Sequence, residues 1–149
     1  MRLTKVAACA ASLLLSAPFA MPQAMAQDAA QPRLIFQLNN AQTVESGCQL
    51  TFVIKNDTGT EIKKSSYNMA IVNAEGQVAT LVTFEFRPLP VGRTKVQQFG
   101  LAGQPCETIS AISINEFVDC LDTNDQPLTV CETAIVQSTK TTIQFPWEL

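Results

Sequence analysis

A serine beside a lysine is one arrangement that can do nucleophilic chemistry, and the sequence has it in Lys63-Lys64-Ser65-Ser66. Such a lysine must be buried and desolvated before it can accept the proton of the serine hydroxyl. These lysines are expected at the start of a strand, where solvent keeps them charged. Histidine, the commonest general base, is absent from all 149 residues. We therefore expect no catalytic residue and no enzymatic activity.

Acidic side chains crowd one later stretch, where oxygen ligands could hold calcium: Asp119, Asp122, Asn124 and Asp125, with Glu132 beyond them. A calcium loop needs several oxygen ligands at fixed spacing, and usually a glycine at its sharp bend. The spacing of Asp122 and Asn124 fits such a loop, but glycine is absent and Pro127 intervenes. We expect a solvated turn that caps a helix, with no metal and no cofactor, and calcium binding near Asp122 is left open.

Cysteine use points to a structural role outside the cytoplasm. Five cysteines are present, and one of them, Cys9, lies in the N-terminal segment described below. The others are Cys48, Cys106, Cys120 and Cys131. Their wide spacing excludes the C-x-x-C pair of thiol oxidoreductases and the short-spaced ligands of a zinc site. An even number in an exported chain predicts two disulfides.

The N-terminus has the three parts of a secretory signal peptide. Arg2 and Lys5 precede an apolar run, and Ala24-Met25-Ala26 supplies the small residues that signal peptidase requires. We expect a signal peptide over 1–26, a flexible tail over 27–32 and one domain over 33–149. The mature protein is then periplasmic or secreted, with no membrane insertion after cleavage.

The charge balance bears on the choice of partner. Without residues 1–26 the chain keeps eight basic residues against 13 acidic ones, a net charge of −5. This sign argues against nucleic acid and anionic lipid surfaces as main partners.

From Leu34 onward the chain reads as short apolar strands separated by turn residues. We expect strands over 34–40, 48–56, 62–72, 77–86, 94–101, 108–116 and 141–145. Asp125-Gln126-Pro127 resembles a helix start, so a short helix is expected over 127–137. The pattern predicts a mainly β protein, an immunoglobulin-like antiparallel β-sandwich of about seven strands with one short helix before the last strand.

Four cysteines allow three pairings, and this fold favours one of them. Cys48 opens the second strand and Cys106 precedes the sixth, so both lie at the same end of an immunoglobulin-like sandwich. Cys120 and Cys131 would then join the end of the sixth strand to the helix.

The third and fourth strands are expected to form a hairpin around a four-residue loop, 73–76, that ends in Gly76. This loop places Ile71 opposite Val78 and Met69 opposite Thr80. The outer face of the hairpin then carries a mildly apolar stripe, which we predict as a partner surface: Ala70, Val72, Ala79 and Leu81. The alternative is that a loop or the tail covers it. Trp147, near the C-terminus, is expected to cap an edge of the sandwich, with a role as an anchor as the alternative.

Several of these segments together resemble a known group of proteins: Gly47-Cys48-Gln49-Leu50-Thr51-Phe52, Gly76, Leu89-Pro90-Val91-Gly92-Arg93-Thr94 and Cys106. They resemble small exported alphaproteobacterial proteins of unknown function with an immunoglobulin-like β-sandwich. The resemblance implies a compartment and a fold, and no catalytic residue or ligand. We expect a non-enzymatic periplasmic interaction module, an accessory subunit that binds an unidentified envelope protein. The alternative is a small-ligand carrier or sensor, with its pocket between the sheets or under the Cys120–Cys131 loop.

Overall fold

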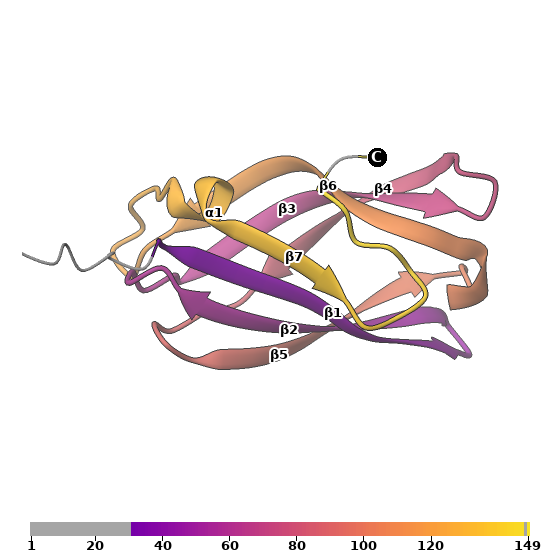
Figure 1. Ribbon diagram of the computed structural model, residues 1–149, viewed down its shortest axis with the longest axis horizontal. Helices are drawn as coiled ribbons and strands as arrows, with labels where there is room; N and C mark the ends of the chain where they lie inside the picture. Colours follow the sequence, from indigo (N-terminus) through magenta and orange to yellow (C-terminus); the bar gives the residue numbers. More distant parts are fainter. Residues whose placement is uncertain (1–30, 148) are drawn as a thin grey trace, which may run out of the picture.

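A computed structural model describes residues 31–147 and 149, which form two packed β-sheets (Figure 1). The predicted signal peptide and residues 27–30 of the predicted tail lie outside the described residues. The strands are β1 Arg33–Val44, β2 Gly47–Asp57, β3 Lys64–Asn73, β4 Val78–Phe86, β5 Thr94–Ala102, β6 Ile109–Leu121 and β7 Ile135–Thr139. The helical segments are a 3₁₀ turn, Cys106–Thr108, and a single turn of α-helix, α1 Val130–Thr133. The predicted mainly β sandwich of seven strands, with one short helix before the last strand, is confirmed.

The two sheets have the orders β5-β2-β1-β7 and β4-β3-β6. All neighbouring strands are antiparallel except β1 and β7, which run parallel from Leu34 opposite Ile135 to Leu38 opposite Thr139. In the standard immunoglobulin arrangement the seventh strand lies beside the sixth. In this protein β7 lies beside β1, in the sheet that does not contain β6. The expected all-antiparallel arrangement is therefore corrected at β7, which is parallel to β1.

The core fills the space between the sheets, and alternation along β2 shows how the sequence specifies it. Cys48, Leu50, Phe52 and Ile54 are all fully buried, as their period of two predicts. Phe52 makes edge-to-face contacts with the rings of Phe84, Phe86, Phe99 and Phe145. Such contacts add about 0.5–1.5 kcal/mol per pair beyond the burial of apolar area.

The predicted register of the β3–β4 hairpin is wrong by two residues. Ile71 lies opposite Thr80 and Met69 opposite Val82. The backbone N–H of Asn73 donates to the carbonyl of Gln77, and the carbonyl of Asn73 accepts the N–H of Gly76, so the loop is one residue shorter than expected. The second residue is taken up by a bulge between Ile71 and Val72. Because two shifts of one residue restore the alternation, the predicted inward and outward faces are largely kept.

The predicted helix over 127–137 is confirmed only as the single turn α1, and the predicted last strand over 141–145 is wrong. Pro127 forms an antiparallel bridge with Leu121 instead of starting a helix, and the backbone N–H of Leu128 donates to the carbonyl of Cys120. After the single turn α1, β-branched residues continue as strand β7. The segment 141–145 pairs with β6 only at one bridge, between Gln144 and Ala111.

The structure joins the four cysteines in the favoured pairs, Cys48–Cys106 and Cys120–Cys131. The first bridge links the start of β2 to the turn before β6. The second links the end of β6 to α1. Within the described residues no helix is long and apolar enough to cross a membrane.

Candidate interaction site

The outer face of the β4-β3-β6 sheet carries a row of apolar and small side chains. Leu81, Ala70 and Ser113 lie opposite one another across the three strands. The Ser113 hydroxyl donates a hydrogen bond of 3.2 Å to the carbonyl oxygen of Trp147, which extends the row beyond β6. Leu81 is 51% exposed and Trp147 49% exposed, so no described segment covers the two ends of the row.

The predicted partner surface lies on this face, but only half of it is accessible. Ala79 and Leu81, on β4, are exposed. Ala70 and Val72, on β3, are only 1% and 5% exposed. They are short side chains on a central strand, between neighbours on β4 and β6 that shield them from solvent. The expected exposed stripe is therefore corrected to the two β4 residues, and their role in binding stays a prediction.

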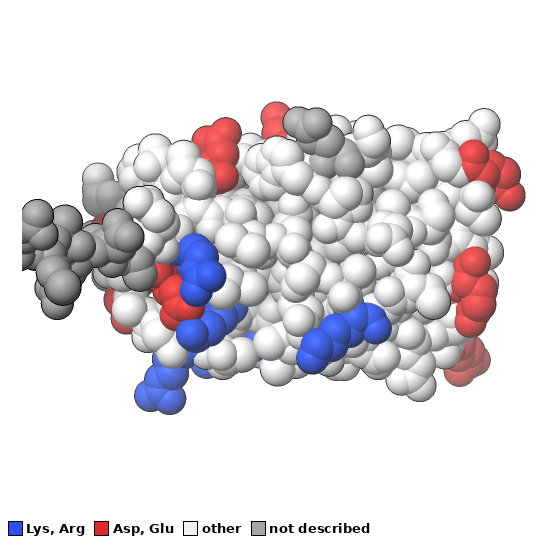
Figure 2. All heavy atoms as spheres, in the orientation of Figure 1, with Lys and Arg blue, Asp and Glu red and all other residues white. Residues whose placement is uncertain are grey.

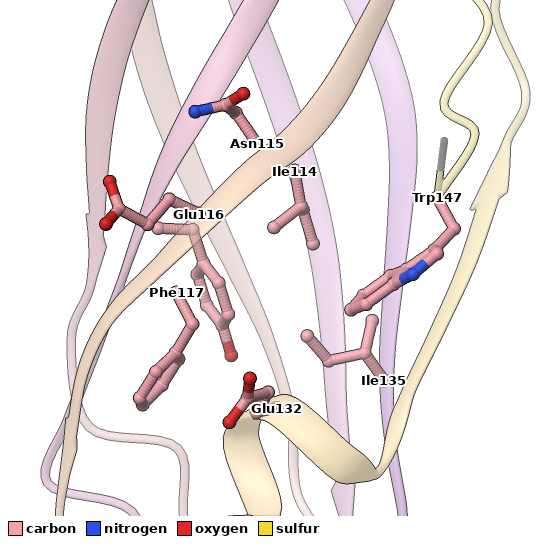
Figure 3. Close-up of a pocket in the computed structure, with 8 residues that line it drawn as sticks. Ile114, Asn115, Glu116, Phe117, Glu132, Ile135 and Trp147 are labelled. Carbon is pink, nitrogen blue, oxygen red and sulfur yellow. The ribbon is translucent and has the colours of Figure 1, made fainter. Parts of the chain in front are cut away.

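A second feature is a groove between β6 and β7, with a volume of about 320 Å³ (Figure 3). Its floor and one wall are apolar: Tyr67, Ile114, Phe117, Ile135 and Trp147. Two carboxylates and one amide complete the lining: Glu132, Glu116 and Asn115. Figure 3 shows Glu132 rising from α1 at one end of the groove, whereas Glu116 and Phe117 lie on the side opposite Trp147.

Strand pairing explains why this groove is open. β7 bonds to β1 and leaves the edge of β6 without a described strand along most of its length. Within the described residues, the backbone of the C-terminal segment pairs with the backbone of that edge only at Gln144, which bonds to Ser110 and Ile112 at 2.9 Å each. Pro146, two residues later, has no N–H to continue the ladder.

The chain around the groove is acidic. Between Lys95 and Lys140 there is no lysine or arginine, but six acidic residues. Two of the six are compensated, since Asp119 pairs with Lys64 at 2.7 Å and Asp125 pairs with Lys63. On the face shown in Figure 2, basic side chains lie over β1 and its neighbours, whereas acidic ones lie over α1, at the far end of the sandwich and beside the basic cluster. This absence of basic residues is the one sequence signal that could have indicated the site.

Helix α1, which forms one wall, is held by two contacts. The hydroxyl of Tyr67 donates a hydrogen bond of 2.8 Å to the carbonyl oxygen of Cys131. Cys131 is also bonded to Cys120 on β6. Burial of Tyr67 raises the pKa of its hydroxyl, which therefore stays protonated and able to donate.

The serine–lysine pair lacks the features of a nucleophilic site. The ammonium of Lys64 lies 2.7 Å from Asp119 and 3.8 Å from Glu85. The hydrogen bond to Asp119 raises the pKa of Lys64, which keeps the ammonium charged and unable to take a proton from Ser65.

The acidic stretch forms a turn stabilised by its own backbone. One oxygen of Asp122 accepts the N–H groups of Asn124 and Gln126, at 2.7 and 2.8 Å. These backbone hydrogen bonds lower the pKa of Asp122. Asp125 points to Lys63 at 2.6 Å. Within residues 31–147 and 149, no group of three or more acidic or cysteine side chains is arranged to hold a metal ion.

Other hollows on the molecule are shallow and open. One of about 350 Å³ lies between β1 and residues 140–143, and one of about 390 Å³ lies between β4 and the end of β5. Neither is the enclosed cavity that most small-ligand carriers have.

Comparison with known proteins shows the fold alone. No protein-family model and no curated protein sequence matches the chain. Among solved structures, IrmA from Escherichia coli is similar in fold, with a TM-score of 0.54 over 72% of this chain and 92% of that one. The two sequences are 12% identical, so the likeness concerns the arrangement of strands.

Proposed function

We propose that this protein is a non-enzymatic module that binds another protein through the outer face of the β4-β3-β6 sheet. The observation that carries the proposal is the apolar row from Leu81 to Trp147, which is about half exposed at both ends. Exposed apolar surface of this kind is typical of protein-binding sites, where aromatic anchors contribute much of the affinity.

The proposed compartment is the periplasm or the extracellular space. Two disulfides in a small domain are typical of oxidising compartments. The sequence resemblance to exported alphaproteobacterial proteins favours the same place. The partner proposed is an envelope protein, with this chain as an accessory subunit.

Crosslinking in intact cells tests the proposal. Tagged protein is crosslinked, purified and analysed by mass spectrometry, beside the variants Leu81→Glu and Val96→Glu. Val96 is a matched control, because it is a 63% exposed apolar residue on β5 of the other sheet. A stoichiometric partner that is lost in Leu81→Glu and kept in Val96→Glu supports the proposal. The same partner in all three samples contradicts the proposed surface.

A small-ligand carrier or sensor is the second candidate, supported by the groove between β6 and β7. A carrier gains thermal stability from its ligand, because the ligand binds only the folded state. A thermal-shift screen that finds a stabilising small molecule, with no protein partner in the crosslinking experiment, would favour this candidate.

A further inference from the structure

We infer that the groove between β6 and β7 binds an extended segment of another protein that carries a basic side chain, added as a new strand along β6. This site shares Trp147 with one end of the proposed partner face, but the edge of β6 and the two carboxylates lie outside that face, so the inference goes beyond the proposed function. Three observations support it: an unpaired strand edge, an apolar floor and uncompensated negative charge.

The edge of β6 offers backbone hydrogen bonds at one side of the groove. Ser110 and Ile112 already bond to Gln144 on this edge, in the manner of a parallel strand. Because strand residues alternate between their two neighbours, Ile114 also directs its N–H and C=O to this edge. Among the described strands, only β3 pairs with β6. An incoming strand could therefore continue the hydrogen-bond ladder on the other edge of β6, beyond the point where Pro146 ends it.

The floor of the groove suits alternate side chains of such a strand. Tyr67 and Ile114 are buried beneath it, whereas Phe117 and Ile135 are partly exposed. Trp147 forms the wall beside β7. An added strand presents every second side chain to one face, so apolar residues of the segment would meet this floor.

Charge complementarity determines the chemistry of the occupant. Glu132 and Glu116 line the groove, are exposed and pair with no described lysine or arginine within 4.0 Å. Two unpaired carboxylates beside a strand edge favour a segment with lysine or arginine and disfavour an acidic one.

The opposite side of the sandwich lacks these features. There Phe84 stacks on Phe99, with ring centroids 4.4 Å apart, and closes the space between β4 and β5. The side chain of Gln97 on β5 also accepts a hydrogen bond from the backbone N–H of Arg87 and donates one to its C=O. The hollow at the far end of β4 and β5 has no charged residue in its lining.

Selection from a random peptide library tests the inference with the isolated, disulfide-bonded mature protein. Phage-displayed 12-residue peptides are the probe, and the most enriched peptide is then synthesised with a fluorescent label. We expect enriched peptides to alternate apolar residues with lysine or arginine. In fluorescence polarisation, Glu132→Lys should weaken binding of the labelled peptide about tenfold or more, because it places like charges together. Glu75→Lys, an exposed acidic residue of the β3–β4 loop, is the matched control and should bind as the wild type does.

Hydrogen exchange locates the bound peptide. The amide of Ile114 should exchange more slowly when the peptide is present, since it would enter a new ladder. No enrichment, peptides without basic residues, or equal binding by Glu132→Lys and Glu75→Lys would each overturn the inference. So would a concentration-dependent dimer that protects the Ile114 amide without peptide, because a second copy would then occupy the edge.

The variant Leu81→Glu separates this inference from the proposed function. It should leave peptide binding unchanged, because Leu81 lies on β4, away from the groove. A partner lost from cells by Leu81→Glu, together with no peptide selected in vitro, would leave the proposed function standing and overturn the inference alone.

Discussion

The hydroxyl of Tyr67 donates a 2.8 Å hydrogen bond to the carbonyl oxygen of Cys131, and this bond fastens helix α1 to strand β3. Cys131 is disulfide-bonded to Cys120, so the same residue also ties the helix to β6. A helix of four residues is not stable by itself, because the entropy lost in ordering the first turn outweighs the free energy of its hydrogen bonds. The position of α1, and with it the wall of the groove that carries Glu132, therefore depends on these two contacts.

Removal of the Tyr67 hydroxyl should weaken the fold. Tyr67→Phe leaves the ring in place and leaves the buried carbonyl of Cys131 without this donor. A lost buried hydrogen bond of this kind costs about 1–3 kcal/mol. Urea unfolding followed by circular dichroism should show a lower midpoint at an unchanged slope. An unchanged midpoint would mean that the bond contributes nothing to stability.

The same hydroxyl predicts sensitivity to alkaline pH. Burial raises the pKa of Tyr67 in the folded protein, whereas an exposed tyrosine ionises near pH 10. Because the unfolded state loses this proton first, the free energy of unfolding should fall as the pH rises above about 10. Tyr67 is the only tyrosine in the sequence, so the ultraviolet absorbance of tyrosinate measures the ionisation of this residue directly. We expect tyrosinate to form only as the protein unfolds; ionisation near pH 10 with the fold intact would contradict the prediction.

Local patterns were sufficient to predict most of the fold. The alternation of Leu50, Phe52 and Ile54 with polar residues predicts which face of β2 is buried, since this pattern can be read from neighbouring positions in the sequence. Turn residues such as Gly76 predicted the position of the hairpin. The length of its loop and the bulge in the strand pairing depend on backbone hydrogen bonds, which no sequence motif indicates.

The last third of the chain was harder to predict because contacts distant in sequence determine it. The N–H of Leu34 bonds to the carbonyl of Ala134, and β7 continues from there along β1. The spacing of Leu128, Cys131 and Ile135 favours a helix, but the pairing of β7 with β1 limits the helix to one turn and places Ile135 in a strand. The groove was missed for the same reason, since it exists only because β7 joins the other sheet.

Two neighbouring residues on the outer face should differ strongly in how much a new charge destabilises the fold. Leu81 and Ala70 lie opposite one another on β4 and β3, but Leu81 is 51% exposed and Ala70 only 1%. Leu81→Glu should change the free energy of unfolding by about 0.5 kcal/mol or less. Ala70→Glu should cost several kcal/mol, because it buries a charge that has no partner. Paired urea titrations measure both, and a large loss in Leu81→Glu would show that this face is covered.

The two disulfides should contribute unequally to stability. The Cys120–Cys131 bridge spans 11 residues and the Cys48–Cys106 bridge spans 58. In the chain-entropy description, loops of these lengths are worth about 3 and about 4 kcal/mol. The double variant Cys120→Ala/Cys131→Ala should therefore lose less stability than Cys48→Ala/Cys106→Ala. Thiol labelling of the unfolded, unreduced mature protein is the control, and any labelled cysteine would contradict two complete bridges.

Calcium should leave the melting temperature unchanged. One carboxylate oxygen of Asp122 already accepts the backbone N–H groups of Asn124 and Gln126, and Asp125 is paired with Lys63. A ligand at 100 times its dissociation constant would stabilise the fold by about 2.7 kcal/mol, a rise of several degrees. We expect millimolar calcium chloride to act no differently from magnesium chloride in a thermal scan. Asp122→Ala should lower the melting temperature by itself, because it removes the acceptor for both N–H groups. A rise with calcium alone that disappears in Asp122→Ala would instead identify the loop as a calcium site.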